Sequence, residues 1–277
     1  MKSKLIYIRI ISFLFINIFI SSCEKTGCTD SSAFNYNPEA KKDDSSCIYL
    51  TDSLSNLNFK INHYFDSEIF SFDSIYFDDF NNIIQFSRAN FYVGNFKFKN
   101  TNYEITEMPS KYFLISPQKQ DYLLGPISNY NISFIDFLIG VDSITNHIDP
   151  ANYQSENDLS YQTPSMHWQM GISPTDWSYL FIVLEGKVDK NNNQIFEPGE
   201  NFVFHIGGDQ LTSSQINLSC NLVEKYFLNY EINLRVNWSN LINNIDLSID
   251  NFTHSSDNFQ LASSISENAS NLISSYP

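Results

Sequence analysis

From about Thr51 onward, short apolar runs alternate with turn residues, which is the pattern of β-strands joined by tight loops. Eight segments have strand character: Leu57–Phe65, Ile83–Phe98, Tyr112–Ile115, Ile132–Ile139, Trp177–Glu185, Phe202–Ile206, Ile216–Leu222 and Ile232–Trp238. A helical period is present only weakly, in Leu261–Ile273. No repeat of roughly 20–50 residues is present, which argues against a propeller or solenoid. The pattern predicts an all-β protein, a two-sheet antiparallel β-sandwich with Greek-key-like connections.

Two of these segments carry further information. In Trp177–Glu185 both alternating faces are largely apolar, which predicts a central strand covered on both sides. Ile83–Phe98 is longer than an ordinary strand, and we expect it to bend near Ser87 or Gly94.

The N-terminus has the pattern of a targeting segment. Three cations precede the apolar run Ile10–Ile20, which ends in Ser21-Ser22-Cys23. This ending resembles the lipobox of bacterial lipoproteins, which implies that residues 1–22 are a signal peptide and that Cys23 carries the lipid that attaches the protein to a membrane. An ordinary signal peptide or a short membrane anchor is the alternative. We therefore expect a cell-envelope protein, on the periplasmic or surface face of the outer membrane.

Composition narrows the class of protein. Lys and Arg number 16 against 31 Asp and Glu, so the formal net charge is −15, and it becomes −18 once the three cations of residues 1–22 are removed. So few cations cannot neutralise a phosphate backbone, which excludes nucleic acid as a partner. The aromatic content of 16% is incompatible with a disordered acidic chain.

A small cysteine-bounded element follows the predicted anchor. With Cys23 lipidated, Cys28 and Cys47 are left as a disulfide pair in an oxidising compartment, within a linker element over residues 23–50. The segment between them resembles a short Cys-Thr-Asp…Asn-Tyr…Asp-Asp…Ser-Cys element of secreted Bacteroidetes proteins. Its acidic and amide side chains fit two alternatives: they bind a calcium ion through their oxygens, or they are solvated and the element is a spacer. Cys220 remains, and we expect it to be buried.

The histidines are the most informative residues for chemistry. Phosphate-loop, nucleophile-elbow, zinc-protease and Cys-x-x-Cys motifs are absent from the sequence, which argues against an enzyme. His167 lies in Pro164-Ser-Met-His-Trp-Gln-Met170, and His205 lies in Phe202-Val-Phe-His-Ile-Gly-Gly208. Neutral imidazoles are the usual protein ligands for copper and zinc. Taken alone, each is more often a structural histidine than a ligand.

Several blocks occur together in a recognisable order: Asn90–Asn95, Phe137–Ser143, Met166-His-Trp-Gln169, Phe181–Gly186 and Phe204-His-Ile-Gly-Gly208. They resemble the MbnP-like family, the copper-binding proteins associated with methanobactin operons. The resemblance implies a β-sandwich over residues 51–250 that holds one copper ion, for sequestration or delivery. It implies that His167 and His205 are ligands and that Trp168 is oxidised to kynurenine by a di-haem peroxidase-like partner. A copper transporter is the other partner that this function implies.

A second metal site is suggested by the loop that begins at Asp189. Six residues fall at the ligand positions of an EF-hand-like calcium loop: Asp189, Asn191, Asn193, Ile195, Glu197 and Glu200. Gln194 occupies the sixth position, where glycine is usual, and a solvated hairpin loop is the alternative. A calcium-stabilised surface adhesion or carbohydrate-binding module is accordingly the second functional hypothesis. Residues 251–277 are expected to form a tail or short helix.

Overall fold

The computed structural model describes residues 24–31, 33, 36–47, 55–127, 131–169, 172–225 and 229–276. It divides into two compact units, separated between residues 53 and 54. The predicted signal peptide and the predicted lipidation site at Cys23 lie outside the described residues.

The first unit is held by a disulfide. Cys28 and Cys47 are bonded, which confirms the predicted pair. β1 (Thr26–Gly27), just before Cys28, forms a short parallel pair with β2 (Lys42–Asp43), which lies inside the loop that this bond closes. The backbone N–H of Asn37 donates to the carbonyl of Cys28 at 2.9 Å, so the element has backbone order of its own.

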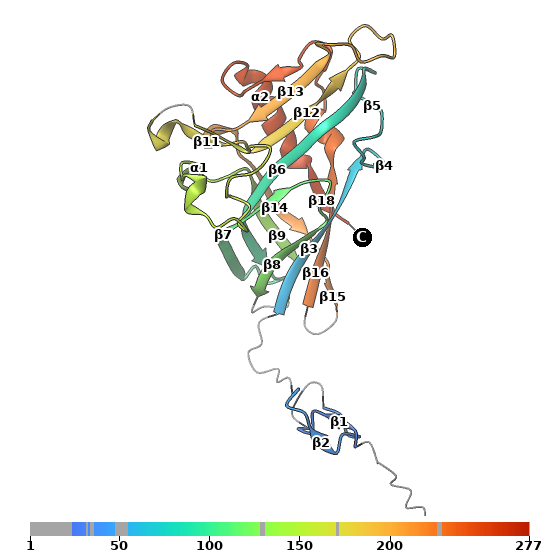
Figure 1. Cartoon of the computed structure of the whole chain (residues 1–277), viewed down its shortest axis with the longest axis vertical. Helices are drawn as coiled ribbons and strands as arrows, with labels where there is room; N and C mark the ends of the chain where they lie inside the picture. Colours follow the sequence, from blue (N-terminus) through green and yellow to red (C-terminus); the bar gives the residue numbers. More distant parts are fainter. Residues whose placement is uncertain are drawn as a thin grey trace, which may run out of the picture. The chain divides into compact units, whose positions relative to one another are not determined.

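The second unit is a two-sheet β-sandwich (Figure 1), as the hydrophobic pattern predicts. One sheet has the order β14-β9-β6-β12-β13-β17, with β5 and β7 also paired to β6. Its strands are β5 (Tyr76–Phe77), β6 (Ile83–Lys99), β7 (Ile105–Ile115), β9 (Phe134–Ile139), β12 (Ile182–Val188), β13 (Asn201–Ile206), β14 (Ser213–Ser219) and β17 (Phe252–Thr253).

The other sheet has the order β15-β16-β3-β4, with β18 paired to β16 and β8 paired to β3. Its strands are β3 (Ser55–Phe65), β4 (Glu68–Ile69), β8 (Asp121–Ile127), β15 (Leu222–Glu224), β16 (Asn229–Asn237) and β18 (Ile273–Ser275). The pairing is not antiparallel throughout, because β16 runs parallel to β3 and β13 runs parallel to β17. The expectation of a purely antiparallel sandwich is corrected on this point, since neither pair is joined by a hairpin that would force opposite directions.

Aromatic side chains fill the space between the two sheets. Phe59 of β3 packs against Phe96 of β6, with ring centroids 5.3 Å apart, and Phe91 of β6 meets Trp238 edge-on at 5.4 Å. Trp238 lies in a 3-10 helix that follows β16 and is fully buried. Cys220 is buried as expected, and burial raises the pKa of its thiol to about 12. The high aromatic content of the chain is therefore largely core.

The long strand β6 is continuous but changes phase at a β-bulge. The register with β12 passes from Arg88 to Phe86, so Ser87 is the extra residue. The core-facing positions consequently change from Phe86 to Ala89 and Phe91, and Arg88 is left on the outward face. A second shift lies beside Gly94. Both irregularities fall where the sequence predicted a bend.

The segment Trp177–Glu185 is two strands rather than the single central strand that was predicted. β11 (Trp177–Tyr179) pairs with β10 (His167–Gln169) in a separate ribbon, and β12 pairs with β6 and β13. The N–H of Leu180 donates to the carbonyl of Met166, whereas the next N–H, of Phe181, donates to Ile206. The backbone thus changes partners between these two residues, which the side-chain alternation alone cannot indicate.

A long excursion between β9 and β12 covers part of the outward face of the larger sheet. It contains α1 (Ser143–Asn146), two 3-10 turns and the β10–β11 ribbon. The hydroxyl of Tyr92 on β6 donates to the backbone carbonyl of Asp158 at 2.9 Å. The hydroxyl of Tyr179 donates to the backbone carbonyl of Leu159 at 2.6 Å. The first bond fixes the excursion against the sheet, and the second, which is buried, joins two parts of the excursion to each other.

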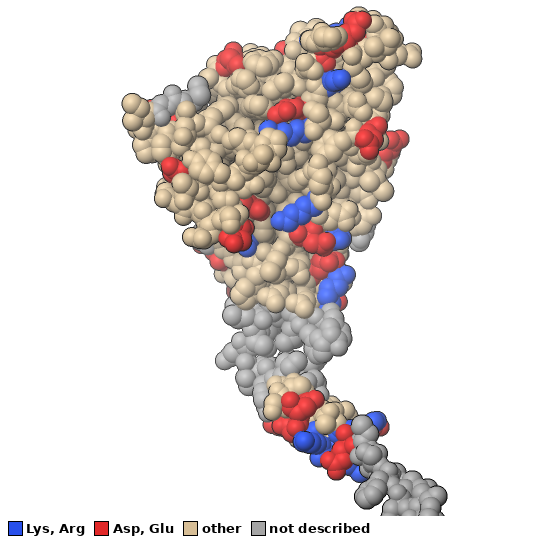
Figure 2. Space-filling model, viewed as in Figure 1, with Lys and Arg blue, Asp and Glu red and all other residues tan. Residues whose placement is uncertain are grey.

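The C-terminal segment is integrated into the sandwich unit. It contains β17, the helix α2 (Phe259–Asn268) and β18, and α2 buries Leu261, Ala262 and Ile265. None of the described helices is both long and apolar enough to span a membrane. On the face that Figure 2 shows, uncharged residues make up most of the sandwich surface and the few cations lie beside acids.

Candidate metal centre

The predicted histidines lie where the excursion meets the outward face of β6, β12 and β13. Because the bulge at Ser87 turns Arg88 outward, Arg88 stands directly opposite Glu185 of β12 in the register. His205 of β13 pairs with Val183 of β12. Val183 lies two residues before Glu185, so the side chains of both point to the same outward face of the sheet. A cavity of about 480 Å³ opens on this face and is lined in part by Arg88, Glu185 and Met166.

Arg88 connects the excursion to the sheet. Its Nη1 donates to Oε1 of Glu185 at 3.1 Å. Its Nη2 donates to the carbonyl of Ser165 at 2.8 Å and lies 3.0 Å from Sδ of Met166, the two residues that precede His167. The side chain of Arg88 is only 13% exposed; its contacts with Glu185 and Met166 are partly buried, whereas its hydrogen bond to Ser165 is exposed. A planar guanidinium is suited to such divergent contacts, because its donors are held in a fixed fork.

His205 contacts a carboxylate and a second imidazole. Its Nε2 lies 2.9 Å from Oε1 of Glu185, and its ring stacks on the ring of His254 with centroids 4.8 Å apart. Burial lowers the pKa of His205, partly offset by the hydrogen bond to Glu185. Gly207, two residues later, passes so close to β11 that an added Cβ would lie 2.3 Å from the carbonyl oxygen of Tyr179. Glycine at this position thus lets the end of β13 reach the β10–β11 ribbon.

His167 is the first residue of β10, the other strand of this ribbon. It pairs with Tyr179 in the β10–β11 register, and its ring meets the Tyr179 ring edge-on at 4.9 Å. Its Nε2 is buried and has no hydrogen-bond partner. Burial lowers the pKa of His167, so its imidazole stays neutral at a lower pH than that of an ordinary histidine. A buried nitrogen of this kind has an unused lone pair or an unsatisfied proton, which costs free energy unless a ligand takes it up.

Trp168 is not on the same face as His167. It pairs with Ser178 in the register and packs half-buried against the core. Since successive side chains of a strand point to opposite faces, Trp168 leaves β10 on the side opposite His167. The structure therefore brings the two histidines to neighbouring pieces of backbone but separates the tryptophan from His167.

The two histidines are linked through other residues rather than directly. Within the described part of the chain, no hydrogen bond or ring contact joins His167 to His205. Among those same residues, no three His, Cys, Asp or Glu side chains converge on one point. The connection runs from the segment before His167 through Arg88 and Glu185 to His205.

With this geometry established, comparison with known proteins identifies the family. The chain matches the MbnP family model over residues 54–258, which is most of its length and includes both histidines. The chain belongs to the MbnP family. This confirms the resemblance to methanobactin-associated proteins that the ordered sequence blocks indicated.

One solved structure similar to the chain is MbnP from Methylosinus trichosporium. The two are 9% identical with a TM-score of 0.49, over 72% of this chain and 81% of that chain. Among curated proteins, none matches the chain.

Three residues of the site in this MbnP domain escape sequence reasoning. No sequence motif assigns Arg88, Glu185 or His254 to the site, and the folded chain brings them to His205 or to its neighbours. One signal was available for Arg88: the apolar phase of β6 changes at Ser87, which places the next residue on the outward face. Glu185 falls in the family block Phe181–Gly186 and His254 is one of the five histidines, but no strand pattern places either of them beside His205.

The predicted calcium ligands all lie in the loop between β12 and β13. Both carboxylate oxygens of Asp189 accept backbone N–H groups, from Asn193 at 3.2 Å and Gln194 at 2.6 Å. The Glu200 carboxylate accepts the N–H groups of Lys190 and Glu197. The other four predicted ligands, Asn191, Asn193, Ile195 and Glu197, are exposed, and Nδ2 of Asn191 donates to the Glu197 carboxylate at 3.0 Å. The calcium site stays a prediction.

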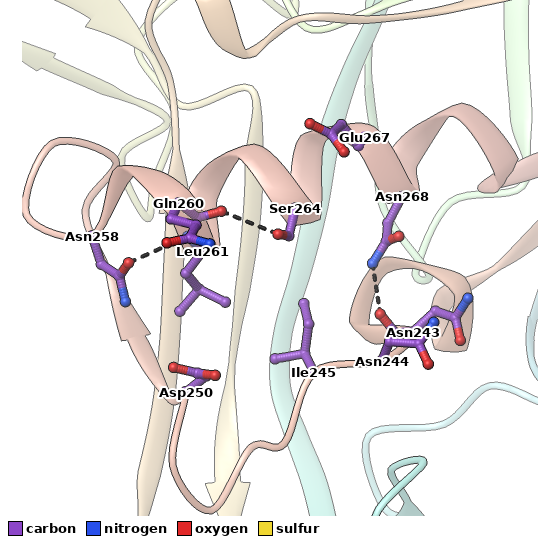
Figure 3. A pocket seen from close by; sticks show the side chains of 10 residues that line it. All are labelled: Asn243, Asn244, Ile245, Asp250, Asn258, Gln260, Leu261, Ser264, Glu267 and Asn268. Atoms are coloured by element: carbon purple, nitrogen blue, oxygen red, sulfur yellow. Dashed lines mark hydrogen bonds between the residues drawn. The ribbon is translucent and has the colours of Figure 1, made fainter.

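A polar cavity of about 410 Å³ lies between α2 and the residues that follow the 3-10 helix at Trp238 (Figure 3). Its amides are engaged locally: Asn268 Nδ2 donates to the carbonyl of Asn243 at 2.9 Å, and Asn258 Oδ1 accepts from the N–H of Leu261 at 3.2 Å. Its lining contains no aromatic ring. It therefore lacks the stacking surface that a carbohydrate-binding module would use.

Proposed function

We propose that the protein is a copper-binding protein of the cell envelope, which holds one copper ion through His167 and His205. It would sequester copper or hand it to a partner such as a copper transporter, and act as a binding protein rather than an enzyme. Two observations support the proposal: membership of the MbnP family over residues 54–258, and the state of the two imidazoles.

The observation that carries the proposal is Nε2 of His167, which is buried without a hydrogen-bond partner. Only a neutral imidazole ligates a metal, and burial lowers the pKa of both His167 and His205. Both side chains are therefore neutral at pH 7. Imidazole nitrogen suits copper, which binds a given nitrogen site more tightly than its first-row neighbours do. The residues present fit the metal that the family implies.

Trp168 enters the proposal as a modification site. Indole offers only an N–H donor, whereas kynurenine offers an aromatic amine and a carbonyl as ligands. A di-haem peroxidase-like partner would carry out this oxidation. Peptide mass spectrometry of the native protein tests it: kynurenine at position 168 supports the modification, and an intact indole in copper-loaded protein rejects it.

Copper titration of the purified protein tests the metal site. Wild type should bind about one copper ion, and His167→Ala and His205→Ala should each abolish stoichiometric binding. His147→Gln is the matched control, because both nitrogens of His147 already have partners, the carbonyl of Trp177 at 2.9 Å and Asp209 at 3.2 Å. Binding that survives in the His167→Ala/His205→Ala double variant contradicts the proposal.

Calcium in the β12–β13 loop is a second candidate, favoured by one backbone feature. Gln194 has a φ of +65°, the left-handed conformation for which EF-hand loops use glycine at this position. Calcium should raise the midpoint of thermal unfolding of wild type but not of the exposed-loop variant Asn191→Ala. An equal response in both rejects the loop as the calcium site, and with it the calcium-stabilised adhesion hypothesis.

A further inference from the structure

We infer that the Arg88–Glu185 pair is the positioning device of the copper site: Glu185 holds the proton of His205 on Nε2, which leaves Nδ1 as the ligating nitrogen. Arg88 holds the Glu185 carboxylate in place and also donates a hydrogen bond to the backbone that leads into His167. The inference rests on the proposed copper function, because it assigns roles to residues that act through the two proposed ligands.

The tautomer of His205 follows from what surrounds its two nitrogens. Nε2 lies 2.9 Å from Oε1 of Glu185, the same oxygen that accepts from Nη1 of Arg88 at 3.1 Å. A carboxylate paired with a guanidinium is an acceptor only, so Nε2 must supply the proton of this hydrogen bond. A ligating imidazole is neutral and has one proton, and therefore Nδ1 carries the lone pair. Among the residues that the structure describes, none forms a hydrogen bond with Nδ1.

The ring of His205 is held in one orientation. Glu185 fixes one edge, and the stacked ring of His254, inclined by 26°, covers one face. Phe252 in turn meets the ring of His254 at 4.6 Å. Carboxylates that orient a metal-binding histidine from behind are a common feature of metal sites, and they raise the basicity of the ligand.

Arg88 acts on the other histidine through the backbone. Its Nη2 donates to the carbonyl of Ser165 at 2.8 Å and, at a longer 3.3 Å, to that of Pro164. These residues lead directly into β10, whose first residue is His167. One guanidinium thus fixes the carboxylate behind His205 and the approach to His167. The bulge at Ser87 matters here, because without it Arg88 would point into the core.

Nitrogen NMR of the metal-free protein tests the tautomer without any copper. Wild type should show a protonated Nε2 and an unprotonated Nδ1 for His205. In Glu185→Gln the amide can both donate and accept, so the fixed preference should be lost and the Nδ1-protonated form should appear. Copper affinity should fall about 10- to 100-fold in the same variant.

Glu107→Gln is the matched control. Glu107 forms an ion pair of similar length, 2.9 Å, with Lys97 on an exposed surface, and it should change neither the tautomer nor the affinity. Arg88→Lys keeps the charge but lacks the fork, so it should weaken copper binding while both histidines remain intact. A thermal unfolding midpoint close to that of wild type verifies that each variant is folded.

The outcomes separate this inference from the copper proposal. A wild-type His205 protonated on Nδ1 overturns the inference, and so does a Glu185→Gln protein with unchanged tautomer and affinity; copper loss in His205→Ala would leave the copper proposal intact. If His205→Ala keeps full copper binding, the copper proposal fails, and the positioning role that we assign to Glu185 fails with it.

Discussion

In the described part of the chain, two histidines have a buried nitrogen without a hydrogen-bond partner, and they differ in what surrounds them. Nδ1 of His63 is one, and the ring of His63 stacks on Trp238, whose Nε1 is also buried and unpartnered. Nε2 of His167 is the other, beside the β10–β11 ribbon. An unsatisfied nitrogen alone does not identify a ligand. His167 is distinguished by its place in the MbnP blocks and by the contacts of Arg88 with the segment before it.

The buried state of His63 predicts sensitivity to acid. Burial lowers the pKa of His63 to about 4, against an ordinary value of 6.5. As pH falls below 6.5, the unfolded chain takes up the proton while the folded one does not, so stability is lost progressively down to about pH 4. The loss amounts to about 3 kcal/mol. Urea unfolding across this range should show a loss of stability that is smaller by about 3 kcal/mol in His63→Phe than in wild type, because the variant retains only the contributions of other groups such as His167 and His205; parallel profiles would contradict the assignment.

At the scale of elements, the sequence predicts where a strand is irregular, but not which side chains the irregularity brings together. The length of Ile83–Phe98 predicts a bend near Ser87 or Gly94, and bulges are found at both. What the bulge accomplishes, turning Arg88 toward Glu185, depends on the register with β12 and cannot be deduced from β6 alone. The division of Trp177–Glu185 into β11 and β12 escapes prediction for the same reason, since the change of backbone partners leaves the side-chain alternation intact.

The second bulge offers a test of packing at this scale. A Cβ added at Gly94 would lie 2.2 Å from the ring of Tyr112, whose hydroxyl is tied to Asp142. Gly94→Ala should therefore lower the free energy of unfolding by about 1–3 kcal/mol through overpacking. In a Tyr112→Ala background, where the ring is absent, the same substitution should cost far less. Equal costs in the two backgrounds, measured by denaturant unfolding, would show that the ring is not the obstacle.

At the scale of the whole molecule, the chain combines a disulfide-bonded element with a sandwich that carries the proposed site. The fold class and the Cys28–Cys47 pair could be predicted, because alternation and cysteine content are local properties. The candidate site could be predicted only as two histidines, because the contacts of His205 with Glu185 and His254 depend on the register of β12 with β13 and on the path of the chain after β17.

The division into two units predicts independent behaviour. A chain beginning at residue 54, where the second unit and the family match both start, should keep the thermal midpoint and the copper stoichiometry of the full protein. Reduction of the disulfide in the full chain should leave the sandwich transition unchanged and make the first unit sensitive to protease. A lowered sandwich midpoint after either treatment would contradict independence of the two units.

The proposed lipid anchor gives a further prediction for the whole molecule. Wild type should fractionate with membranes and be released by detergent, whereas Cys23→Ser should be recovered in the aqueous fraction with its sandwich folded. Metabolic labelling with a fatty-acid analogue should mark wild type and not the variant. Membrane association of an unlabelled Cys23→Ser protein would point to the apolar run Ile10–Ile20 as an uncleaved anchor instead.

The central claim is that one copper ion lies between His167 and His205. Anomalous X-ray scattering at the copper edge, from crystals of the copper-loaded protein, locates the metal directly. We predict a single strong peak within bonding distance of Nε2 of His167 and Nδ1 of His205. A peak elsewhere, or no peak at stoichiometric loading, would contradict the account.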